Sequence, residues 1–223
     1  MTIEDRRDRE KLQMKNLIVQ AAAHIIVNEG YDKLSIRKIA NQIEYSPAII
    51  YHYFSNKNEI LSQVLRQGYQ TLMSALSDGQ TTNGTPETRI KVLTRKYIDA
   101  ALENPDQFLA VQLNNSPEVL EFTAYLFEGA AAEKPALTIL AQAVQDICAG
   151  QNVSSSEIEL TAQIIAASTL GLITKLILEK DISEQQRKQL IDQFAETVVR
   201  MARRQPETEP VSNNVMKRKG TIK

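Results

Sequence analysis

The run Tyr51–Tyr53, of sequence Tyr-His-Tyr, is the most distinctive chemical group in the chain. It follows Ser46 and Pro47, a pair in which a serine that can cap a helix precedes a proline suited to the first helical position. Imidazole and phenol groups bind phosphate oxygens and base edges, and small apolar residues such as Pro47 and Ala48 can contact a thymine methyl group. This group therefore predicts a short helix that reads double-stranded DNA.

The other reactive side chains do not form a catalytic or metal-binding pattern. The sequence has two histidines, His24 and His52, and one cysteine, Cys148. It has no Gly-rich phosphate loop, no Ser/His/Asp grouping and no set of ligands at zinc-site spacing. His24 lies beside an apolar helical stripe and is expected to pack or to face solvent. We expect no enzyme activity, no metal, and no cofactor other than an unidentified small-molecule effector.

Composition favours an all-α protein of the cytoplasm. Aromatic residues make up 5% of the chain and Trp is absent, whereas helix-forming Ala, Leu, Gln and Glu are abundant. One cysteine cannot form an intrachain disulfide, which suits a reducing compartment. The sequence has no run of about 18 uncharged apolar residues, so we expect no membrane partner.

Charge is unevenly distributed along the chain. Residues 1–66 contain ten Lys and Arg against eight Asp and Glu, a net +2, whereas residues 67–204 contain twelve against seventeen, a net −5. A weakly positive N-terminal part permits DNA binding but is less basic than a typical nucleic-acid-binding domain. The DNA-binding hypothesis therefore depends on the motif and not on net charge.

Helix start and stop signals divide the N-terminal part into four helices. The first helix is expected to run from about residue 4 to residue 29, because apolar residues recur at three- and four-residue spacing from Leu17 to Ile26 and Gly30 then ends it. Three further helix starts follow at capping residues, namely Ser35, Ser46-Pro47 and Asn56. We expect residues 1–66 to form a helix-turn-helix domain whose fourth helix, from about residue 56, connects it to the body.

The segment Ser35–Phe54, with Lys57 after it, resembles the helix-turn-helix of the TetR family of bacterial transcriptional regulators. That pattern is a helix led by Thr or Ser, a turn, an L-Y-x-H/Y-F motif and a Lys, matched here by IYHYF and Lys57. The resemblance covers about residues 12–66 and implies that the third helix enters the major groove. Tyr53 is equally consistent with a core aromatic residue. The predicted DNA-binding residues are Ser35, Arg37, Lys38, Ser46, Pro47, Ala48, Tyr51, His52, Tyr53 and Lys57.

Two features of this region leave alternatives open. Glu44 stands where the family often has Gly, so the turn is expected to have a less comfortable backbone or a different shape. Arg6, Arg7 and Arg9 suit an N-terminal arm that touches DNA, but interleaved acids suit a solvated helix end equally well.

Residues 67–204 are expected to form a larger helical domain that binds an effector and dimerises. Between Lys96 and Lys134 the chain has acids but no Lys or Arg, which favours a small apolar or cationic effector over an anion. Aromatic residues at helical spacing are also consistent with an ordinary core. The candidate cavity residues are Tyr97, Phe108, Gln112, Phe122 and Tyr125.

The last two helices are expected to pair with those of a second copy, as in the family that the N-terminal part resembles. A helix through Gly171 is easier to understand if another backbone approaches there, because Gly lowers helix stability by about 1 kcal/mol relative to Ala. The candidate interface residues are Ile164, Ala167, Gly171, Thr174, Phe194 and Val198. Residues 205–223 are expected to be a disordered tail.

Together these features predict a homodimeric, ligand-responsive transcriptional repressor that leaves a palindromic DNA operator when a small-molecule effector binds. The competing hypotheses are an enzyme, a helical scaffold that binds only proteins, and a regulator without an effector. The protein scaffold would leave Tyr51–Tyr53 and Lys57 without a purpose.

Overall fold

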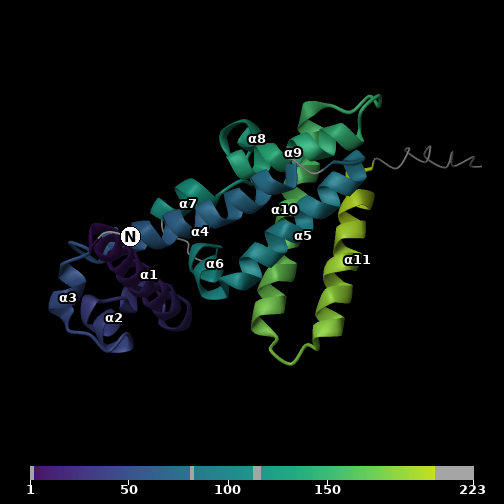
Figure 1. The fold of residues 1–223 in the computed structure, drawn as a ribbon. Coiled ribbons are helices and arrows are strands. Elements are labelled where there is room, and N and C mark those ends of the chain that lie inside the picture. The colour runs from purple at the N-terminus through teal and green to yellow at the C-terminus, as the bar shows by residue number, and fades with distance from the viewer. Residues whose placement is uncertain (1–2, 81–82, 113–116, 204–223) are drawn as a thin grey trace, which may run out of the picture.

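The computed structural model describes residues 3–80, 83–112 and 117–203. Within these ranges the regular elements are all helices, so the all-α prediction is confirmed (Figure 1). The N-terminal elements are α1 (Ile3–Glu29), the 3-10 helix η1 (Tyr31–Lys33), α2 (Ile36–Gln42), α3 (Pro47–Tyr51) and α4 (Lys57–Gln80). The body elements are α5 (Pro86–Glu103), α6 (Pro105–Gln112), α7 (Pro117–Thr123), α8 (Ala130–Glu133), α9 (Pro135–Ile147), α10 (Ser155–Leu178) and α11 (Glu184–Ala202). The predicted tail, residues 205–223, lies outside the described residues.

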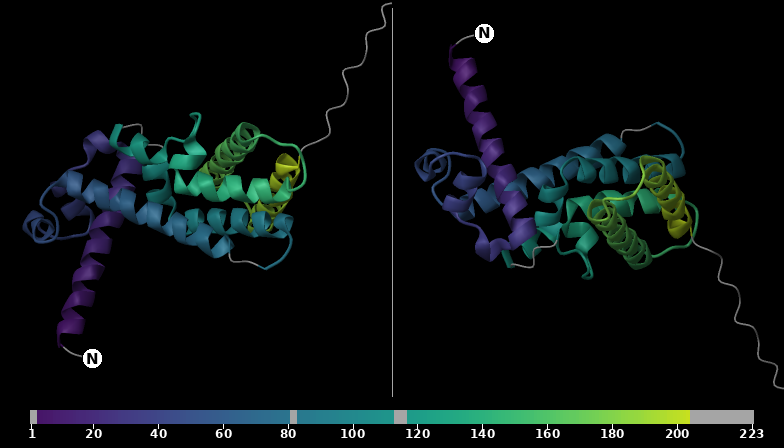
Figure 2. Two further views of the ribbon diagram at one scale, coloured as in Figure 1. Left: turned by 90° about the horizontal axis from the view of Figure 1, so that it is seen from above. Right: turned by 90° about the horizontal axis from the view of Figure 1, so that it is seen from below.

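The first four helices enclose one hydrophobic core. Each contributes a fully buried isoleucine: Ile18, Ile39, Ile50 and Ile60. The first turns of α1 lie outside this core, and Figure 2 shows them projecting from the rest of the molecule. The core fixes α2 and α3 against α1 and so leaves their outer faces in solvent.

α4 belongs to both parts of the molecule. Its first turns supply Ile60 and Val64 to the N-terminal core, whereas Leu72 lies in a second core with α5, α6 and α10. The boundary predicted at residue 66 therefore falls inside one continuous helix. From the body, α6 contributes Ala110 to the N-terminal core, so the two parts share packed side chains.

The breaker-rich run of residues 78–84 predicts the end of the fourth helix, and α4 continues through Asp78 and Gly79 to end at Gln80, within that run. Gly79 is instead the point at which α5 crosses α4. A Cβ atom at Gly79 would lie 2.8 Å from Leu93 Cδ1 and 3.0 Å from the Leu93 Cα. The glycine is therefore needed for a close approach of two helices and not for a turn.

The body helices pack around three further groups of buried side chains. α5, α9, α10 and α11 meet around Ile90, Val144, Ile165 and Val198, each at most 1% exposed. α10 and α11 run side by side at the end of the molecule opposite α3 (Figure 1). This arrangement holds the DNA-binding candidate residues and the last two helices at opposite ends.

The segment after residue 116 differs most from the prediction. The helix-start residues Ser116-Pro117 and the apolar residues after them predict one helix that carries Tyr125 and Phe127, but α7 ends at Thr123 and residues 124–129 form a loop. Gly129, with a φ of 86°, then precedes the short α8, which was not predicted. Tyr125 is consequently placed by a loop and not by a helix.

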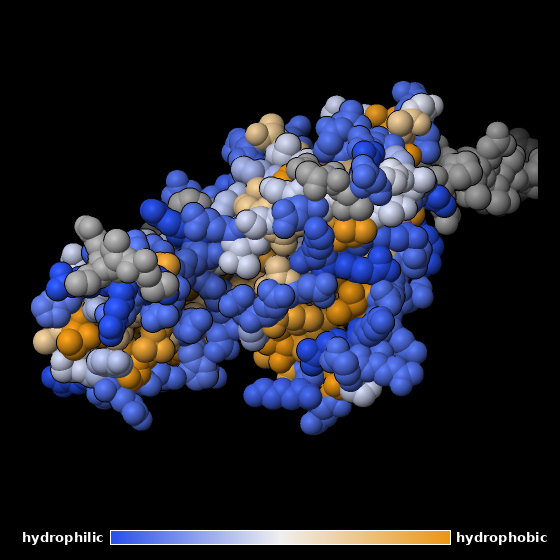
Figure 3. All heavy atoms as spheres, in the orientation of Figure 1, coloured by the Kyte–Doolittle hydropathy of each residue, from blue (hydrophilic) through white to orange (hydrophobic). Residues whose placement is uncertain are grey.

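α10 is the one described helix that is long and apolar enough to cross a membrane by length and composition. Only 33% of its most apolar window is buried within the chain. Figure 3 shows apolar side chains gathered over the lower part of α10, beside α11. An exposed apolar face of this kind also suits contact with another protein chain.

Candidate DNA-binding surface and effector cavity

The turn between α2 and α3 is a complete Schellman motif built around Glu44. The Tyr45 N–H donates to the Ala40 carbonyl at 2.9 Å, and the Glu44 N–H donates to the Asn41 carbonyl at 3.3 Å. Glu44 has a φ of 59°, the left-handed conformation that glycine usually supplies. The turn therefore has the backbone shape that a glycine at position 44 would give, and Glu44 adopts this shape at the cost of backbone strain.

Capping groups fix the two helices on either side of this turn. The Ser35 hydroxyl accepts from the Lys38 N–H at 3.2 Å, as expected for the N-cap of α2. At Ser46 the side chain makes no cap hydrogen bond, and Pro47 occupies the first turn of α3. α3 ends at Tyr51, after which the His52 and Tyr53 N–H groups bond to carbonyls only three residues back.

The outer face of α3 presents small and hydrogen-bonding side chains to solvent. Pro47, Ala48, Tyr51 and His52 are exposed, while Ile50 is fully buried beneath them. Tyr53 is half-buried and packs against the N-terminal core, which matches its alternative interpretation as a core aromatic residue. This face can offer the Tyr51 phenol and the His52 imidazole to bases or phosphates.

Two of the predicted cations are engaged within the chain. The Lys38 ammonium is paired with the Glu29 carboxylate, and the Lys57 ammonium lies 4.9 Å from the centre of the Tyr31 ring. Arg37 is exposed on α2. Lys57 therefore stands at the first position of α4 in a fixed place, held over an aromatic face.

One exposed residue of this surface was not predicted. Tyr45 is 44% exposed in the turn, directly before Ser46 and next to the exposed face of α3. Its position immediately before the helix-start residues Ser46-Pro47 was the signal in the sequence that could have identified it as part of this surface.

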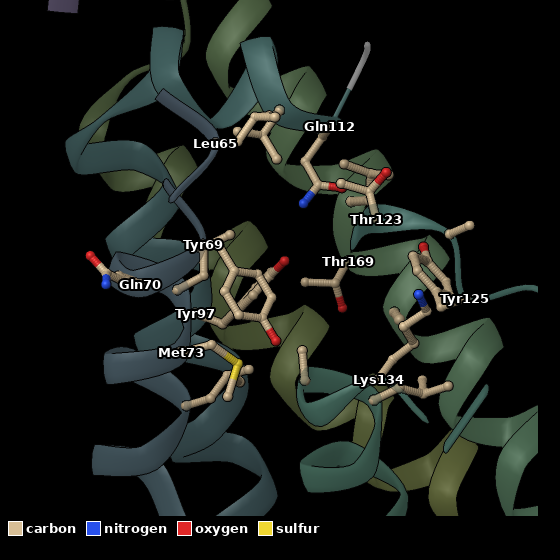
Figure 4. A pocket seen from close by; sticks show the side chains of 18 of the residues that line it. Leu65, Tyr69, Gln70, Met73, Tyr97, Gln112, Thr123, Tyr125, Lys134 and Thr169 are labelled. Atoms are coloured by element: carbon tan, nitrogen blue, oxygen red, sulfur yellow. The ribbon is translucent and has the colours of Figure 1, made fainter. Parts of the chain in front are cut away.

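A second site is a cavity of about 850 Å³ inside the body. It is lined by side chains of α4, α5, α6, α9 and α10 and by the loop that follows α7. In Figure 4, Tyr69 and Tyr97 project from one wall, while Thr123, Tyr125 and Lys134 lie on the opposite wall. The volume suits a drug-sized or larger ligand with a mainly apolar surface.

Three of the predicted cavity residues line this space, namely Tyr97, Gln112 and Tyr125. Phe108 does not, because it is 3% exposed and packs in the core shared by α4, α5, α6 and α10. The side chain of Phe122 lies outside the described residues. Tyr69 and Thr169 were missed as lining residues, although Tyr69 falls on the same helical face as Leu65, Leu72 and Leu76.

The charges around the cavity differ from those expected. Its described lining contains Arg66 and Lys134 and no Asp or Glu. Asp106, one of the acids used to argue for a cationic effector, lies outside that lining and contacts His24 at 2.6 Å. The argument for a cationic effector therefore fails for the part of the cavity that the structure describes.

Neutral phenols supply much of the polarity of the cavity. Burial, with a further contribution from nearby Tyr125, raises the pKa of Tyr97 far above its usual range. Burial also raises the pKa of Tyr69 and of Tyr125. These hydroxyl groups are consequently uncharged hydrogen-bond donors and acceptors at neutral pH.

The residues predicted for a dimer interface fall into two groups. Ile164, Ala167 and Gly171 are exposed along one side of α10, and Thr174 and Phe194 are half-buried. Val198 is fully buried in the core formed by α5, α9, α10 and α11, so its prediction as an interface residue is wrong. Among the described residues, no three His, Cys, Asp or Glu side chains form a group able to hold a metal ion.

Comparison with protein families supports the N-terminal interpretation. Residues 18–64 match the family model described as bacterial regulatory proteins, tetR family. The chain carries a TetR-family domain. The resemblance inferred from Ser35–Phe54 and Lys57 is therefore confirmed, and the matched range contains the whole of α2 and α3 with the second part of α1 and the first turns of α4.

Curated relatives match about half of this chain. It is 25% identical over 101 residues to the uncharacterized HTH-type transcriptional regulator YuxN of Bacillus subtilis, covering 45% of this chain and 34% of the relative. It is 23% identical over 104 residues to the fatty acid metabolism regulator protein of Bacillus subtilis, covering 47% and 54%. The matched region thus spans from about a third to about half of these relatives.

Solved structures share the fold over most of the chain. A putative fatty acid metabolism regulator of Clostridium perfringens has a TM-score of 0.66 at 18% identity, covering 83% of this chain and 97% of that one. The TetR-family regulator PfmR of Thermus thermophilus has a TM-score of 0.59 at 19% identity, covering 90% and 97%. The body as well as the N-terminal domain therefore has the fold of TetR-type proteins.

Proposed function

We propose that this protein is a cytoplasmic transcriptional repressor that binds a palindromic DNA operator as a homodimer and is released by a small-molecule effector. The observation that carries the proposal is the solvent-facing surface of α3, with Ala48, Tyr51 and His52, within a TetR-family domain. A helix presented in this way reads base edges in the major groove, while flanking groups contact phosphates.

The apolar side of α10 supports the homodimer. Leu160 and Ile164 are more than half exposed, and a Cβ atom at Gly171 would meet nothing within 4 Å in the chain. A second copy packed there would bury these side chains and give the glycine a neighbour. Two α3 helices would then read half-sites about 34–36 Å apart on the operator.

We propose an amphipathic effector with a long apolar body and an anionic group. The cavity is large and mainly apolar, and Arg66 and Lys134 are its described cations. Similarity to regulators named for fatty acid metabolism supports the same class. α6 would connect effector to DNA, because Gln112 lines the cavity while Ala110 lies in the N-terminal core. The effector must bind the DNA-free conformation more tightly for release to occur.

DNA binding is tested by gel shift with DNA that flanks the encoding gene. Wild type should bind one segment in preference to random DNA, and Tyr51→Ala or His52→Ala should weaken that binding by about 1–3 kcal/mol. His24→Ala, which removes a histidine on α1 outside this surface, is the matched control. Affinity that is indifferent to sequence and to both α3 substitutions would leave a protein-binding scaffold as the better hypothesis.

The effector class is tested by thermal shift with dodecanoate, dodecanol and dodecylamine. These compounds have nearly the same apolar chain and differ in the polar group, which is anionic, neutral and cationic respectively. Dodecanoate should stabilise the protein most, and Lys134→Met should reduce its advantage over dodecanol. Stabilisation by dodecylamine above both of the others would contradict the proposed anionic group.

A further inference from the structure

The loop of residues 124–129 forms part of the cavity wall and is held from behind by α10. Ala124 and Tyr125 line the cavity. The side-chain nitrogen of Gln163, on α10, donates to the carbonyl oxygens of Tyr125 at 2.8 Å and Phe127 at 2.9 Å. One amide group thus fixes two points of the loop and uses both of its N–H bonds to do so.

A second residue of α10 holds the end of the same loop. The Glu159 carboxylate accepts from the Ala130 N–H at 2.9 Å, at the start of α8. The same carboxylate oxygen lies 3.4 Å from the side-chain nitrogen of Gln163, one helical turn away. On one face of α10, the Gln163 amide therefore donates to two loop carbonyls and the Glu159 carboxylate accepts from the N–H that follows the loop.

Burial makes the position of Gln163 sensitive to the position of the loop. Gln163 is 7% exposed, so water does not readily replace a lost partner. The next residue, Ile164, is turned about 100° around the helix and faces solvent with Leu160. α10 thus contacts the cavity wall on one side and presents the proposed pairing surface on another.

We infer that Gln163 is a positioning residue that couples the effector cavity to pairing of two chains. A second copy packed on Leu160 and Ile164 holds α10 in place, Gln163 transmits that position to the loop, and the loop places Tyr125 in the cavity. Ligand affinity consequently differs between monomer and dimer. The inference rests on the proposed function only for the pairing of two chains through α10.

The test uses two substitutions of different chemistry in the full chain. Gln163→Glu keeps the shape but sets a carboxylate oxygen against two carbonyl oxygens, and Gln163→Met removes the donors without adding charge. Gln145→Glu makes the same chemical change on the exposed side of α9 and is the control. Circular dichroism checks that helical content is unchanged in all three variants.

Two measurements follow the loop and the coupling separately. Hydrogen exchange of the amides in residues 124–130 should become about tenfold faster in both Gln163 variants and stay unchanged in the control. Binding of anilinonaphthalene sulfonate is titrated at protein concentrations above and below the dimer dissociation constant. In wild type the probe should bind one state about 5- to 150-fold more tightly, and in the Gln163 variants that ratio should approach one.

Several results would overturn the inference. Unchanged loop exchange in both Gln163 variants would remove the positioning role, and equal probe affinity for wild-type monomer and dimer would remove the coupling. The coupling would also be refuted if the probe does not bind wild type or if the chain stays monomeric. Operator binding is measured independently. If the protein binds its operator but shows no coupling, the proposed function stands and this inference fails. If it shows the coupling but binds no operator, the proposed function fails and this inference stands.

Discussion

Glu44 shows how a single residue can carry strain without changing the shape of a recognition turn. Its φ of 59° completes the Schellman motif between α2 and α3. A side chain in the left-handed region costs about 1–2 kcal/mol, which glycine avoids at some cost in unfolded-state entropy. The turn is held because Ile39 and Ala40 on one side and Ile50 on the other are buried in the same core.

Glu44→Gly should therefore stabilise the protein by about 1 kcal/mol. The urea midpoint should rise with no change in slope. Glu44→Ala removes the carboxylate but keeps a Cβ atom, so it should bring little gain in stability. If both variants raise DNA affinity equally while only glycine raises the midpoint, charge and strain act separately. Equal stabilisation by alanine and glycine would refute the strain argument.

The sequence was sufficient to predict which α3 side chains face solvent, because burial of Ile50 and Phe54 determines the opposite face. The partners of the cations were not predictable. Lys38 pairs with Glu29 and Lys57 lies over Tyr31, contacts that depend on how α1 and η1 end relative to α2 and α4. Such geometry is set by three-dimensional packing and leaves no periodic signal.

At the scale of elements, capping residues marked the helix starts correctly, even at Ser46 where the side chain makes no cap hydrogen bond, and isolated glycines were ambiguous. Thr85, Ser154 and Ser183 each accept a backbone hydrogen bond at the start of a helix, as their sequences indicate. Gly79 lies within a breaker-rich run, yet it belongs to a helix, and the close approach of α5 accounts for the glycine there. The four-residue α8 was missed because AAAE has no periodicity to detect.

Gly79→Ala should destabilise the protein by about 1–3 kcal/mol, because the new methyl group would overlap the Leu93 backbone and side chain. Ser77→Ala, on an exposed position of the same helix, is the control and should have little effect. Combining Gly79→Ala with Leu93→Ala should recover little stability, since the backbone of Leu93 remains in place. Urea unfolding measures all three, and an unchanged midpoint for Gly79→Ala would show that the helices can separate freely.

A pair of charges links the start of α5 to the end of α11 and makes stability depend on pH. A hydrogen bond from Arg203, at 2.9 Å, is the largest cause that lowers the pKa of Glu87 to about 2 from 4.5. A lowered carboxyl pKa adds stability that is complete above about pH 4.5 and is lost as the pH falls towards 2.

Glu87→Gln should thus be less stable than wild type at pH 7 and equally stable near pH 2, as judged by urea midpoints across this range. Salt should reduce the difference at pH 7, because the pair is partly exposed. A constant difference at every pH would mean that packing, and not the charge, explains the effect of the substitution.

The whole molecule combines parts that the sequence predicted with unequal success. The N-terminal domain carries local motifs, and its four helices follow from caps and periodicity. The cavity is assembled from residues as distant as Leu65 and Thr169, and its lining depends on how five helices and a loop meet. Composition could therefore propose aromatic and polar candidates but could not tell lining residues from core residues. Tyr97 and Gln112 line the cavity, whereas Phe108 packs in the core.

A substitution on the exposed side of α10 should have opposite effects on the stability of one chain and on the stability of the dimer. Gly171 has no neighbour within 4 Å in the chain, so Gly171→Leu should stabilise the isolated helix by about 1 kcal/mol. In the proposed dimer the same side chain meets a partner backbone, and the dissociation constant should rise. Sedimentation equilibrium measures the dimer, and urea unfolding at dilute concentration measures the single chain.

Ser77→Leu adds the same side chain to an exposed position on α4 and should leave the dimer unchanged. Ile164→Glu should also dissociate the dimer, because it places a carboxylate on a face where an apolar side chain is 56% exposed. Leu12→Glu, an equally exposed position on α1, is its control. If Gly171→Leu and Ile164→Glu leave the dimer as intact as their controls do, the two chains pair through another surface. The spacing of two α3 helices on DNA would then have to come from a different arrangement of the same fold.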